Sequence, residues 1–366
     1  MEANAARAIA IYLPQFHPIP ENDEWWGKGF TEWTNVTKAR PLFPGHLQPD
    51  LPSELGFYDL RVPEVRDAQA ALAREHGISG FCYYHYWFDG KVLLGRPVDE
   101  LLALGRPEFP FMLCWANESW TRTWLGRGRE ILIEQRYSPE GYAAHARYLG
   151  KFFRDQRYIR IDGRPAFAVY RPTAIPDAAR MVDIFRSVCR ETTGEDLYLI
   201  ASNSHAPREA EKLLGYGFDA ILNFTPQLGA LKAALKERVS ARRFLKNVVQ
   251  HRAVNAKTKI FTYPEAAQAM RSIEPPDLAK TLPCVFVGWD NTPRRGKAAV
   301  VITGNDPALF EQELRRAKTR VESTPSHPGI VFINAWNEWA EGNHLEPGRS
   351  GGRGHLEAVK RVFPLA

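Results

Sequence analysis

The sequence predicts a (β/α)8 barrel, and three observations lead to that fold. Eight short apolar runs recur along the 366 residues, stretches of helical periodicity separate them, and 44% of the residues are hydrophobic, which is enough for a full core. Near-continuous apolar runs are typical of parallel strands that are buried on both faces. Regular alternation of such strands with helices favours a closed barrel, and a doubly wound open sheet is the alternative.

Each predicted element rests on its own stretch of sequence. The strand candidates are 8–13, 78–84, 111–115, 166–170, 197–201, 220–224, 284–287 and 330–334. Helical periodicity of about 3.6 residues marks 62–75, 138–153, 175–191, 207–215 and 307–323. Pro63 lies near the start of the first of these helices and Gly77 lies just beyond its end, as is usual at helix termini. Because no repeat or linker interrupts this order, we expect one domain over residues 1–366.

Three connections from a strand to the next helix are longer than ordinary βα loops, which run to about 2–6 residues. They follow the first strand (14–61), the third strand (116–137) and the sixth strand (225–283). Such loops lie at the C-terminal face of a barrel, where active sites are built. We therefore expect the functional site at that face.

The sixth-strand connection, 225–283, is a basic insertion. Between 231 and 259, Glu237 is its only acidic residue. Its basic residues there are Lys232, Lys236, Arg238, Arg242, Arg243, Lys246, Arg252, Lys257 and Lys259. Apolar residues at roughly helical spacing favour a helical hairpin. One interpretation is a solvated basic face. The other is a patch that brings the protein to an anionic glycan or to a membrane surface.

Charge and cysteine usage limit the class of protein. A net charge of +6 and a pI near 9.1 permit an anionic partner without requiring one. The four cysteines are widely spaced and form no CxxC pair, which favours a reducing compartment. No run approaches the ~20 apolar residues of a membrane span, and the first residues do not resemble a signal peptide. We expect a cytoplasmic protein with no nucleic-acid partner and no obligate protein partner.

The tryptophans lie at or just beyond the ends of the predicted strands. They are Trp25, Trp26, Trp33, Trp87, Trp115, Trp120, Trp124, Trp289, Trp336 and Trp339. Flat aromatic faces suit the C–H faces of pyranose rings, and indole N–H groups bind hydroxyls. Amides and neutral imidazoles at the same strand ends both donate and accept hydrogen bonds, as a sugar requires. The alternative is that these residues brace long loops.

A sugar-binding mouth is therefore the interpretation that these positions favour. The candidate substrate contacts at the strand ends are His17, Trp33, Tyr83, His85, Tyr86, Trp115, Asn117, Glu118, Trp120, Tyr170, Asn203, Trp289, Asp290, Trp336 and Asn337.

Two carboxylates follow the eighth predicted strand, in N-A-W-N-E-W-A-E-G at 334–342. Glu338 and Glu341 are three residues apart, so one turn of helix places them on one face. Glycosidic cleavage needs one group to protonate the leaving oxygen and a second carboxylate at the sugar. Trp336 and Trp339 could desolvate them and raise one pKa. The alternative is a pair of acids that stabilise a helix N-terminus.

Other chemistries have little support. The sequence contains no G-x-G-x-x-G, P-loop, H-E-x-x-H or Asp-x-Asp pattern. His17, His85 and Asp89 could bind a metal, but their spacing is nonspecific. We expect no cofactor and no metal.

Four segments carry a resemblance to a known family. YLPQFHPIPENDEWWGKGFTEWTNVTKARPLFPGHLQP (12–49), GFCYYHYWFDGKVLL (80–94), FPFMLCWANESWTRTW (109–124) and INAWNEWAEGNHLEP (333–347) resemble WbsX-type proteins, which are related to glycoside hydrolase family 99. The resemblance runs from the first predicted strand to the last. Proteins of this type often occur with bacterial O-antigen and surface-polysaccharide synthesis.

The resemblance implies a (β/α)8 barrel and a retaining, endo-acting mechanism, because the characterised relatives are endo-α-mannosidases. By this resemblance Glu338 is the general base on the sugar 2-hydroxyl, which attacks its own anomeric carbon. Glu341 then protonates the leaving oxygen and later activates the water that opens the 1,2-anhydro sugar. Tyr12 matches a substrate-side tyrosine, and Gln15 stands where the mannosidases place a bulky aromatic.

Departures from the mannosidase pattern put the substrate in doubt. Ala340 replaces a usual histidine, Asn343-His344 replaces a threonine-glutamine pair, and Leu125 replaces an aspartate more common in WbsX-type chains. The leading hypothesis is a glycoside hydrolase on a bacterial polysaccharide or oligosaccharide. The alternatives are a glycosyltransferase or transglycosylase in surface-polysaccharide assembly and a noncatalytic glycan-binding protein.

Overall fold

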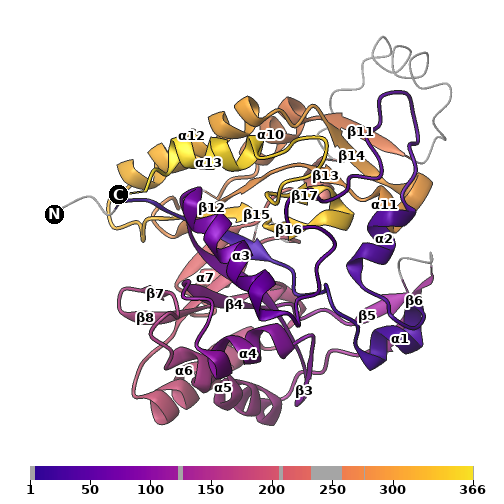
Figure 1. The fold of residues 1–366 in the computed structure, drawn as a ribbon. Helices are drawn as coiled ribbons and strands as arrows, with labels where there is room; N and C mark the ends of the chain where they lie inside the picture. Colours follow the sequence, from indigo (N-terminus) through magenta and orange to yellow (C-terminus); the bar gives the residue numbers. More distant parts are fainter. Residues whose placement is uncertain (1–4, 123–126, 206–208, 232–257, 276, 366) are drawn as a thin grey trace.

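A closed barrel of parallel strands forms the centre of the computed structural model, which describes residues 5–122, 127–205, 209–231, 258–275 and 277–365 (Figure 1). Within these residues the barrel has eight strands: β1 (Arg7–Tyr12), β2 (Ile78–Phe88), β4 (Phe111–Trp115), β8 (Arg164–Val169), β9 (Tyr198–Ser202), β10 (Ala220–Asn223), β12 (Thr281–Phe286) and β15 (Ile330–Asn334). Each pairs with its neighbours in chain order, and β1 pairs with both β15 and β2. The predicted (β/α)8 fold is confirmed.

A helix follows each barrel strand in the described part of the chain. These helices are α3 (Pro63–Glu75), α4 (Arg96–Leu104), α5 (Pro139–Phe153), α6 (Ala178–Thr193), α7 (Ala210–Gly215), α10 (Tyr263–Arg271), α12 (Pro307–Ser323) and α13 (Gly354–Val362). Five were predicted, with ends within three residues of those observed. The sequence analysis missed α4, α10 and α13, which have nine residues each. Nine residues make about two and a half turns, too few for a clear helical period.

Side-chain caps fix where several of these helices begin. Ser138 accepts a hydrogen bond from the Gly141 backbone at the start of α5, and Asp177 and Asp306 cap α6 and α12 in the same way. Helix α10 begins with a capping box between Thr262 and Glu265. These local signals agree with the positions that the sequence periodicity requires.

The connections at the C-terminal ends of the strands carry their own elements, which Figure 1 shows gathered at one end of the barrel. They are α1 (Pro20–Trp26), α2 (Glu32–Lys38), β3 (Lys91–Leu93), β5 (Trp120–Arg122), β6 (Arg127–Ile133), η2 (Pro172–Ala174), β11 (Lys259–Thr262), β13 (Trp289–Asp290), α11 (Thr292–Arg295), η3 (Gly296–Ala298), β14 (Val300–Thr303), β16 (Asn337–Glu338), η4 (Trp339–Glu341) and β17 (Asn343–His344). The short strand β7 (Arg160–Ile161) pairs with β8 before the barrel proper.

The connection after β12 corrects the sequence analysis, which recognised only three long connections. It runs over 287–306 and holds β13, α11, η3 and β14, and β14 joins β11 and β13 in a separate three-stranded sheet. The predicted helical hairpin at 231–259 lies almost wholly outside the described residues, and Lys259 begins strand β11 instead. The long connections after the first and third strands are confirmed.

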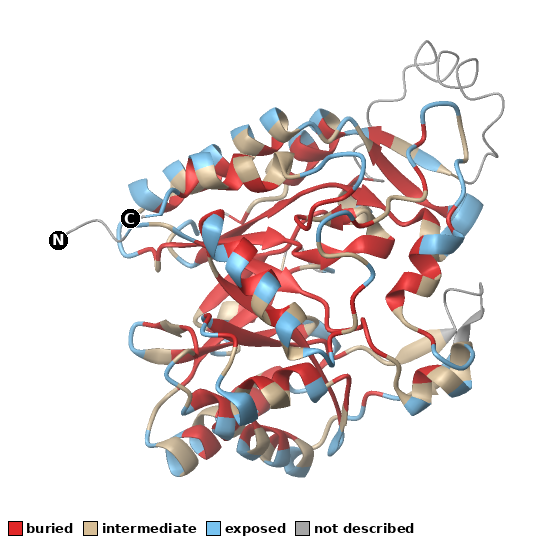
Figure 2. Ribbon diagram, viewed as in Figure 1, coloured by how far each residue is buried: buried red, intermediate tan, exposed pale blue. Residues whose placement is uncertain are grey.

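Burial follows the layers of the barrel, with buried strands inside and helices exposed on their outer faces (Figure 2). The wholly buried core includes Ala8 and Ala10 of β1, Phe167 of β8 and Phe332 of β15. Cys82, Cys114, Cys189 and Cys284 are buried free thiols. In the described ranges, no helix combines the length and the apolar character that a membrane crossing requires.

Candidate active site

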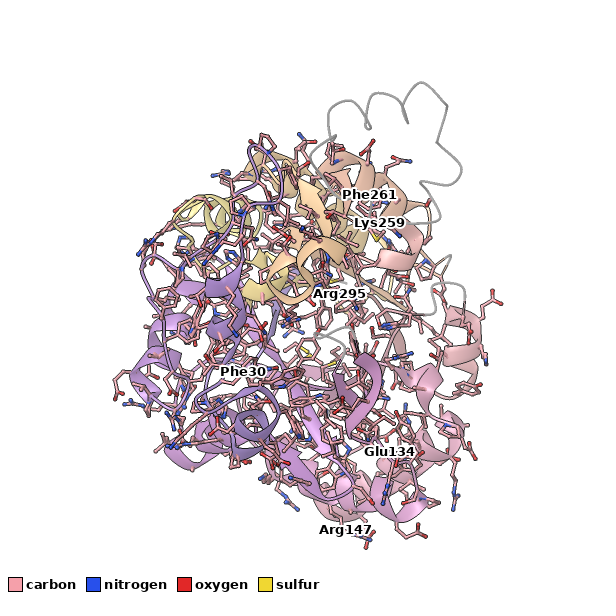
Figure 3. All side chains as sticks on the ribbon, turned by 90° about the vertical axis from the view of Figure 1, so that its right-hand side faces the viewer. Phe30, Glu134, Arg147, Lys259, Phe261 and Arg295 are labelled. Carbon is pink, nitrogen blue, oxygen red and sulfur yellow. The ribbon has the colours of Figure 1, made fainter. Side chains whose placement is uncertain are left out.

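A cavity of about 680 Å³ opens at the C-terminal face of the barrel. Figure 3 views the molecule from this side, with Arg295 in the connection that follows β12 and with Phe30 and Glu134 in the connections that follow β1 and β4. The lining combines acids, amides and aromatic rings, with Glu338 and Glu341 on one wall. A mixed aromatic and polar lining at this face is suited to a polyhydroxylated ligand.

The turn that carries the two acids is built from β16, η4 and β17. Glu338 ends β16, and the 3-10 turn η4 carries the chain to Glu341. Residues three apart are eclipsed on a 3-10 turn, so both carboxylates project to the same side. Gly342 has φ +56° and ends the turn, and a Cβ there would lie 2.9 Å from the Cβ of Asp290. The sequence spacing therefore predicted a shared face, although the turn is 3-10 and not α-helical.

Glu346 stabilises this turn through hydrogen bonds. Its carboxylate accepts hydrogen bonds from Trp339 Nε1 at 2.6 Å, from the Tyr58 hydroxyl at 2.7 Å and from Gln69 Nε2 at 2.6 Å. Burial raises the pKa of Glu346 to about 7, although its three donors and His344 act in the opposite direction. The Trp339 ring stacks on His344 at a centroid distance of 3.6 Å, which closes the turn.

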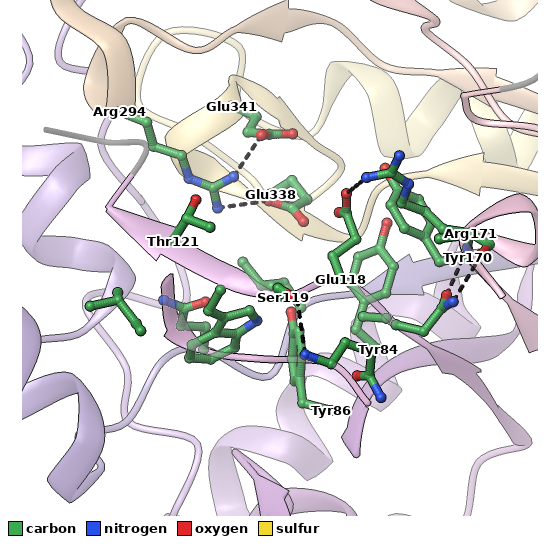
Figure 4. Close-up of a pocket in the computed structure, with 18 of the residues that line it drawn as sticks. Tyr84, Tyr86, Glu118, Ser119, Thr121, Tyr170, Arg171, Arg294, Glu338 and Glu341 are labelled. Atoms are coloured by element: carbon green, nitrogen blue, oxygen red, sulfur yellow. Dashed lines mark hydrogen bonds and ion pairs between the residues drawn. The ribbon is translucent and has the colours of Figure 1, made fainter. Parts of the chain in front are cut away.

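Arg294 joins both acids to a third one. From α11, its Nη1 lies 2.6 Å from Glu341 Oε1 and its Nη2 lies 3.2 Å from Glu338 Oε2 (Figure 4). The same guanidinium contacts Glu32 of α2 through Nε at 2.8 Å and Nη2 at 2.7 Å. The three carboxylates therefore come from two different loops, and Arg294 from a third loop contacts all of them.

Burial is the main cause of the high pKa values in the acid pair. It raises the pKa of Glu338 to about 8, against the pull of Arg294 and with help from Glu341 and Glu32. Burial also raises the pKa of Glu341, with Arg294 again opposing. The carboxylates hold the pKa of Arg294 well above its usual value in spite of its burial. The pair therefore keeps a proton near neutral pH.

The opposite wall comes from β2, β4 and β8. Tyr84, Tyr86 and Tyr170 face the cavity, and Glu118 Oε1 accepts a hydrogen bond from Arg171 Nη1 at 2.7 Å (Figure 4). Asn117 fixes this wall, because its amide accepts from the Arg171 backbone at 2.7 Å and donates to the Arg171 carbonyl at 2.9 Å.

Nine of the predicted site residues line the cavity. They are Gln15, Tyr86, Asn117, Glu118, Trp120, Tyr170, Trp289, Glu338 and Glu341. Trp120 meets Tyr86 and Trp25 edge to face, at centroid distances of 5.2 and 5.8 Å. These positions agree with the sugar-binding interpretation of the strand ends.

Four predicted contacts instead lie between the barrel and its helices. Tyr12 donates to Gln69 of α3 at 2.6 Å, and Tyr83 packs on Tyr12. His85 Nε2 lies 3.0 Å from His145 Nε2 of α5, and Trp115 Nε1 donates to the Trp87 carbonyl at 3.2 Å. The physical reason is strand alternation: Tyr84 and Tyr86 face the cavity, so Tyr83 and His85 face the helices.

The other six predicted contacts also lie outside the cavity lining. His17 is 2% exposed, and burial lowers its pKa to about 4. Trp33 donates to the Tyr58 carbonyl at 2.9 Å. Asn203 bonds Asn223, and Asn337 bonds both backbone groups of Leu13.

Asp290 and Trp336 complete this group. Asp290 holds the connection after β1 in place, because its Oδ2 lies 2.6 Å from His46 Nε2 and 2.6 Å from Gln48 Nε2. Trp336 is wholly buried against Phe81. These residues therefore brace loops, which is the alternative that the sequence analysis considered.

Sequence reasoning missed several residues that shape the cavity. Arg294 and Arg171 belong to no motif, and Glu32 is one acid among many in the first long loop. Tyr84 could have been found, because it shares the period-two face of Tyr86 on one strand. Leu125 and Trp124 lie outside the described residues. Among the residues that the structure does describe, no group of three or more His, Cys, Asp or Glu side chains is placed to hold a metal.

The fold and cavity place the chain in a class of (β/α)8 barrels with solved members. The GH99 endo-α-mannosidase from Bacteroides thetaiotaomicron, in complex with Bis-Tris propane, matches with a TM-score of 0.57 and 14% identity over 97% of this chain and 95% of that chain. A glycoside hydrolase-like protein matches with a TM-score of 0.59 and 13% identity over 100% of this chain and 96% of that chain.

The sequence matches identify the family. Residues 8–359 match the family described as glycosyltransferase WbsX, and the chain belongs to this family. The uncharacterized protein WxcX of Xanthomonas campestris pv. campestris, from strains B100 and ATCC 33913, is 39% identical over all 366 residues of this chain. The chain spans about half the length of these curated relatives, because the match covers 50% of each.

Proposed function

We propose that the protein is a retaining, endo-acting glycoside hydrolase that cleaves a bacterial polysaccharide or oligosaccharide. The observation that carries this proposal is the Glu338–Glu341 pair, two acids with raised pKa values on one wall of an aromatic cavity. The likeness in fold to GH99 endo-α-mannosidases supports the reaction class. Mannose as the substrate sugar does not follow from it.

Each acid has a separate role in the proposed reaction. Glu338 removes the proton of the sugar 2-hydroxyl, whose oxygen attacks the anomeric carbon while Glu341 protonates the departing glycosidic oxygen. The product of this step is a 1,2-anhydro sugar. Glu341, now ionised, then removes a proton from water that attacks the anomeric carbon, and the 2-oxygen regains a proton from Glu338. The two inversions give net retention.

The proposed reaction steps require a particular charge state of the Glu338–Glu341 pair. One proton on the pair is the active state, since one acid acts as a base and the other as an acid. Burial raises the pKa of both acids, so the pair as a whole holds this proton. The proposed roles place it on Glu341, and both carboxylates share Arg294. A raised pKa also makes Glu338 a stronger base once it is ionised.

A transglycosylase is the second candidate, and the family description favours it. The family is described as a glycosyltransferase, and a sugar acceptor that takes the place of water would form a new glycosidic bond from the same intermediate. Glycan binding without catalysis is the third candidate. It gives no account of two neighbouring acids with raised pKa values, a feature that is common at catalytic sites.

Two measurements test the proposal. Glu338→Gln and Glu341→Gln should each lower turnover of a cleaved bacterial glycan by about 100-fold or more while leaving the fold intact. Anomeric proton NMR of the first product should show retention, and mass spectra with added acceptor sugar separate hydrolysis from transfer. Glycan binding that persists in both variants, with no cleavage by the wild type, would establish the noncatalytic candidate.

The 2-hydroxyl step has its own test. A substrate that lacks the reacting 2-hydroxyl should bind the wild type but react far more slowly, because the neighbouring group supplies the nucleophile. A direct carboxylate nucleophile needs no such group. Isolation of a glycosyl ester on Glu338 would contradict the anhydro route.

A further inference from the structure

Glu32 is a buried acid that the proposed chemistry does not use. It lies on α2, its exposed fraction is 0%, and it is absent from the cavity lining. Its Oε1 contacts Arg294, and its Oε2 has no hydrogen-bond partner among the described residues. Burial of a carboxylate with one cationic partner can cost folding free energy, because its desolvation can exceed the attraction of the ion pair.

A purely structural explanation for Glu32 is available but incomplete. An acid in the first turn of α2 is favourable to the helix, and its ion pair with Arg294 ties α2 to α11. Neither role requires the same guanidinium to reach Glu341 at 2.6 Å and Glu338 at 3.2 Å. A planar guanidinium with five donors can fix several carboxylates at once, which an ammonium cannot do.

The charges explain why a third acid matters. One cation and three ionised carboxylates give 1 − 3 = −2, and one bound proton reduces this to −1. Without Glu32, one cation would face the catalytic pair alone, and 1 − 2 = −1 would already be reached with both acids ionised. The negative charge of Glu32 raises the pKa of both Glu338 and Glu341.

The groups that face the pair are known from each packed element. They are Glu32 from α2, Arg294 and Arg295 from the β12 connection, Tyr84 and Tyr86 from β2, and Tyr170 after β8. Burial raises the pKa of each of the three tyrosines well above 10, so they stay neutral near neutral pH. Glu32 and the arginines therefore set the charge around the pair.

We propose that Arg294 and Glu32 are positioning residues: Arg294 fixes the spacing of Glu338 and Glu341, and Glu32 offsets the charge of Arg294 so that the pair keeps one proton. This inference rests on the proposed function for its catalytic meaning. The relation between Glu32 and the proton on the pair does not depend on any substrate.

The decisive variant is Glu32→Gln, which keeps the size of the side chain and an oxygen that can accept from Arg294. Protein labelled with carbon-13 at the glutamate carboxyl is titrated by NMR, with Glu338→Gln and Glu341→Gln used to identify the two resonances. Loss of the Glu32 charge should lower the highest titration midpoint of the pair by about 1 pH unit. Glu24→Gln is the matched control, because Glu24 is exposed on neighbouring α1.

Activity supplies a second readout once a cleaved glycan is known. Glu32→Gln should lower kcat by about 10-fold or more with little change in KM, since substrate does not touch Glu32. The alkaline limb of kcat/KM should move to lower pH with the NMR midpoint. Glu32→Asp should restore the midpoint, and Arg294→Lys should lower kcat while leaving the midpoint near its original value.

Different results would defeat the inference and the proposed function. An unchanged midpoint in folded Glu32→Gln would overturn the inference, whether or not the wild type cleaves a glycan. A shifted midpoint in a protein that only binds glycans would defeat the proposed function and leave the charge relation standing. If Glu32→Gln does not fold, the double variant Glu32→Gln, Arg294→Gln removes both charges together. Its midpoint should not fall below the wild-type value, because Arg294 affects both acids more strongly than Glu32 does. A downward shift there would overturn the inference.

Discussion

The carboxyl group of Glu338 is buried beside two other acids, Glu341 and Glu32, and Arg294 offsets part of their charge. Such a group is costly to keep ionised, because burial raises its pKa to about 8. A carboxyl whose pKa is higher in the folded than in the unfolded protein destabilises the fold as pH rises, since the folded state binds protons more tightly. The penalty begins near the usual glutamate pKa and is complete above the folded pKa.

Replacement of Glu338 by Gln should therefore stabilise the protein at alkaline pH. Glu338→Gln and wild type should have similar free energies of unfolding at about pH 5, and the variant should be more stable by about 1–3 kcal/mol at about pH 8.5. Urea unfolding at several pH values measures the difference, with Glu24→Gln as the exposed control. A variant that is less stable than wild type at both pH values would show that Glu338 is a structural residue.

At the scale of elements, alternation along β2 decides which aromatic residues reach the cavity. Tyr84 and Tyr86 face the cavity. His85 contacts α5 and Tyr83 packs on Tyr12, so two of the three predicted candidates on this strand lie away from the cavity. The sequence predicted every barrel strand, because long apolar runs are a strong signal. It did not predict the face of each side chain, because both faces of a barrel strand are apolar.

The turn that carries Glu338 and Glu341 depends on Glu346, an acid outside the cavity. Its three donors, Trp339, Tyr58 and Gln69, belong to η4, the first long loop and α3. The spacing of Glu338 and Glu341 predicted a shared face, but the sequence did not indicate this support. Its partners are up to 288 residues away in the chain, and no local pattern reports such contacts.

Loss of the Glu346 side chain should loosen this turn. Glu346→Ala leaves three buried donors unpaired and should lower the free energy of unfolding by about 3 kcal/mol or more. Chemical unfolding at about pH 6 measures it. Glu191→Ala on α6 is the control, because Glu191 is exposed and should change stability by less than about 0.5 kcal/mol. An equal change in the free energy of unfolding in both variants would show that Glu346 does not support this turn.

At the scale of the whole molecule, the site is assembled from loops that are far apart in sequence. Glu32 follows β1, Arg294 follows β12 and the acid pair follows β15, and each loop supplies one part of the charge cluster. The sequence analysis located the correct face, since the C-terminal ends of parallel strands meet there. It could not pair Glu32 with Arg294, which are 262 residues apart.

The basic insertion is the remaining large feature, and residues 232–257 lie outside the described part of the chain. From sequence, its arginines and lysines predict attraction to anionic surfaces, worth about 1 kcal/mol per basic residue near an anionic bilayer. Replacing Arg242, Arg243 and Lys246 with Gln should therefore weaken sedimentation with anionic liposomes by about 100-fold at low salt.

The matched control replaces Arg147, Arg180 and Arg190, which are exposed on α5 and α6, with Gln. Both triple variants lose the same formal charge, so a general effect of net charge should weaken liposome binding equally in the two. A specific patch at 232–257 should weaken it only in the first, and salt should abolish the wild-type binding because exposed charges are screened. Turnover of a small soluble glycan should be unchanged in both variants. Wild-type protein that does not sediment with these liposomes even at low salt would leave the insertion as a solvated basic face.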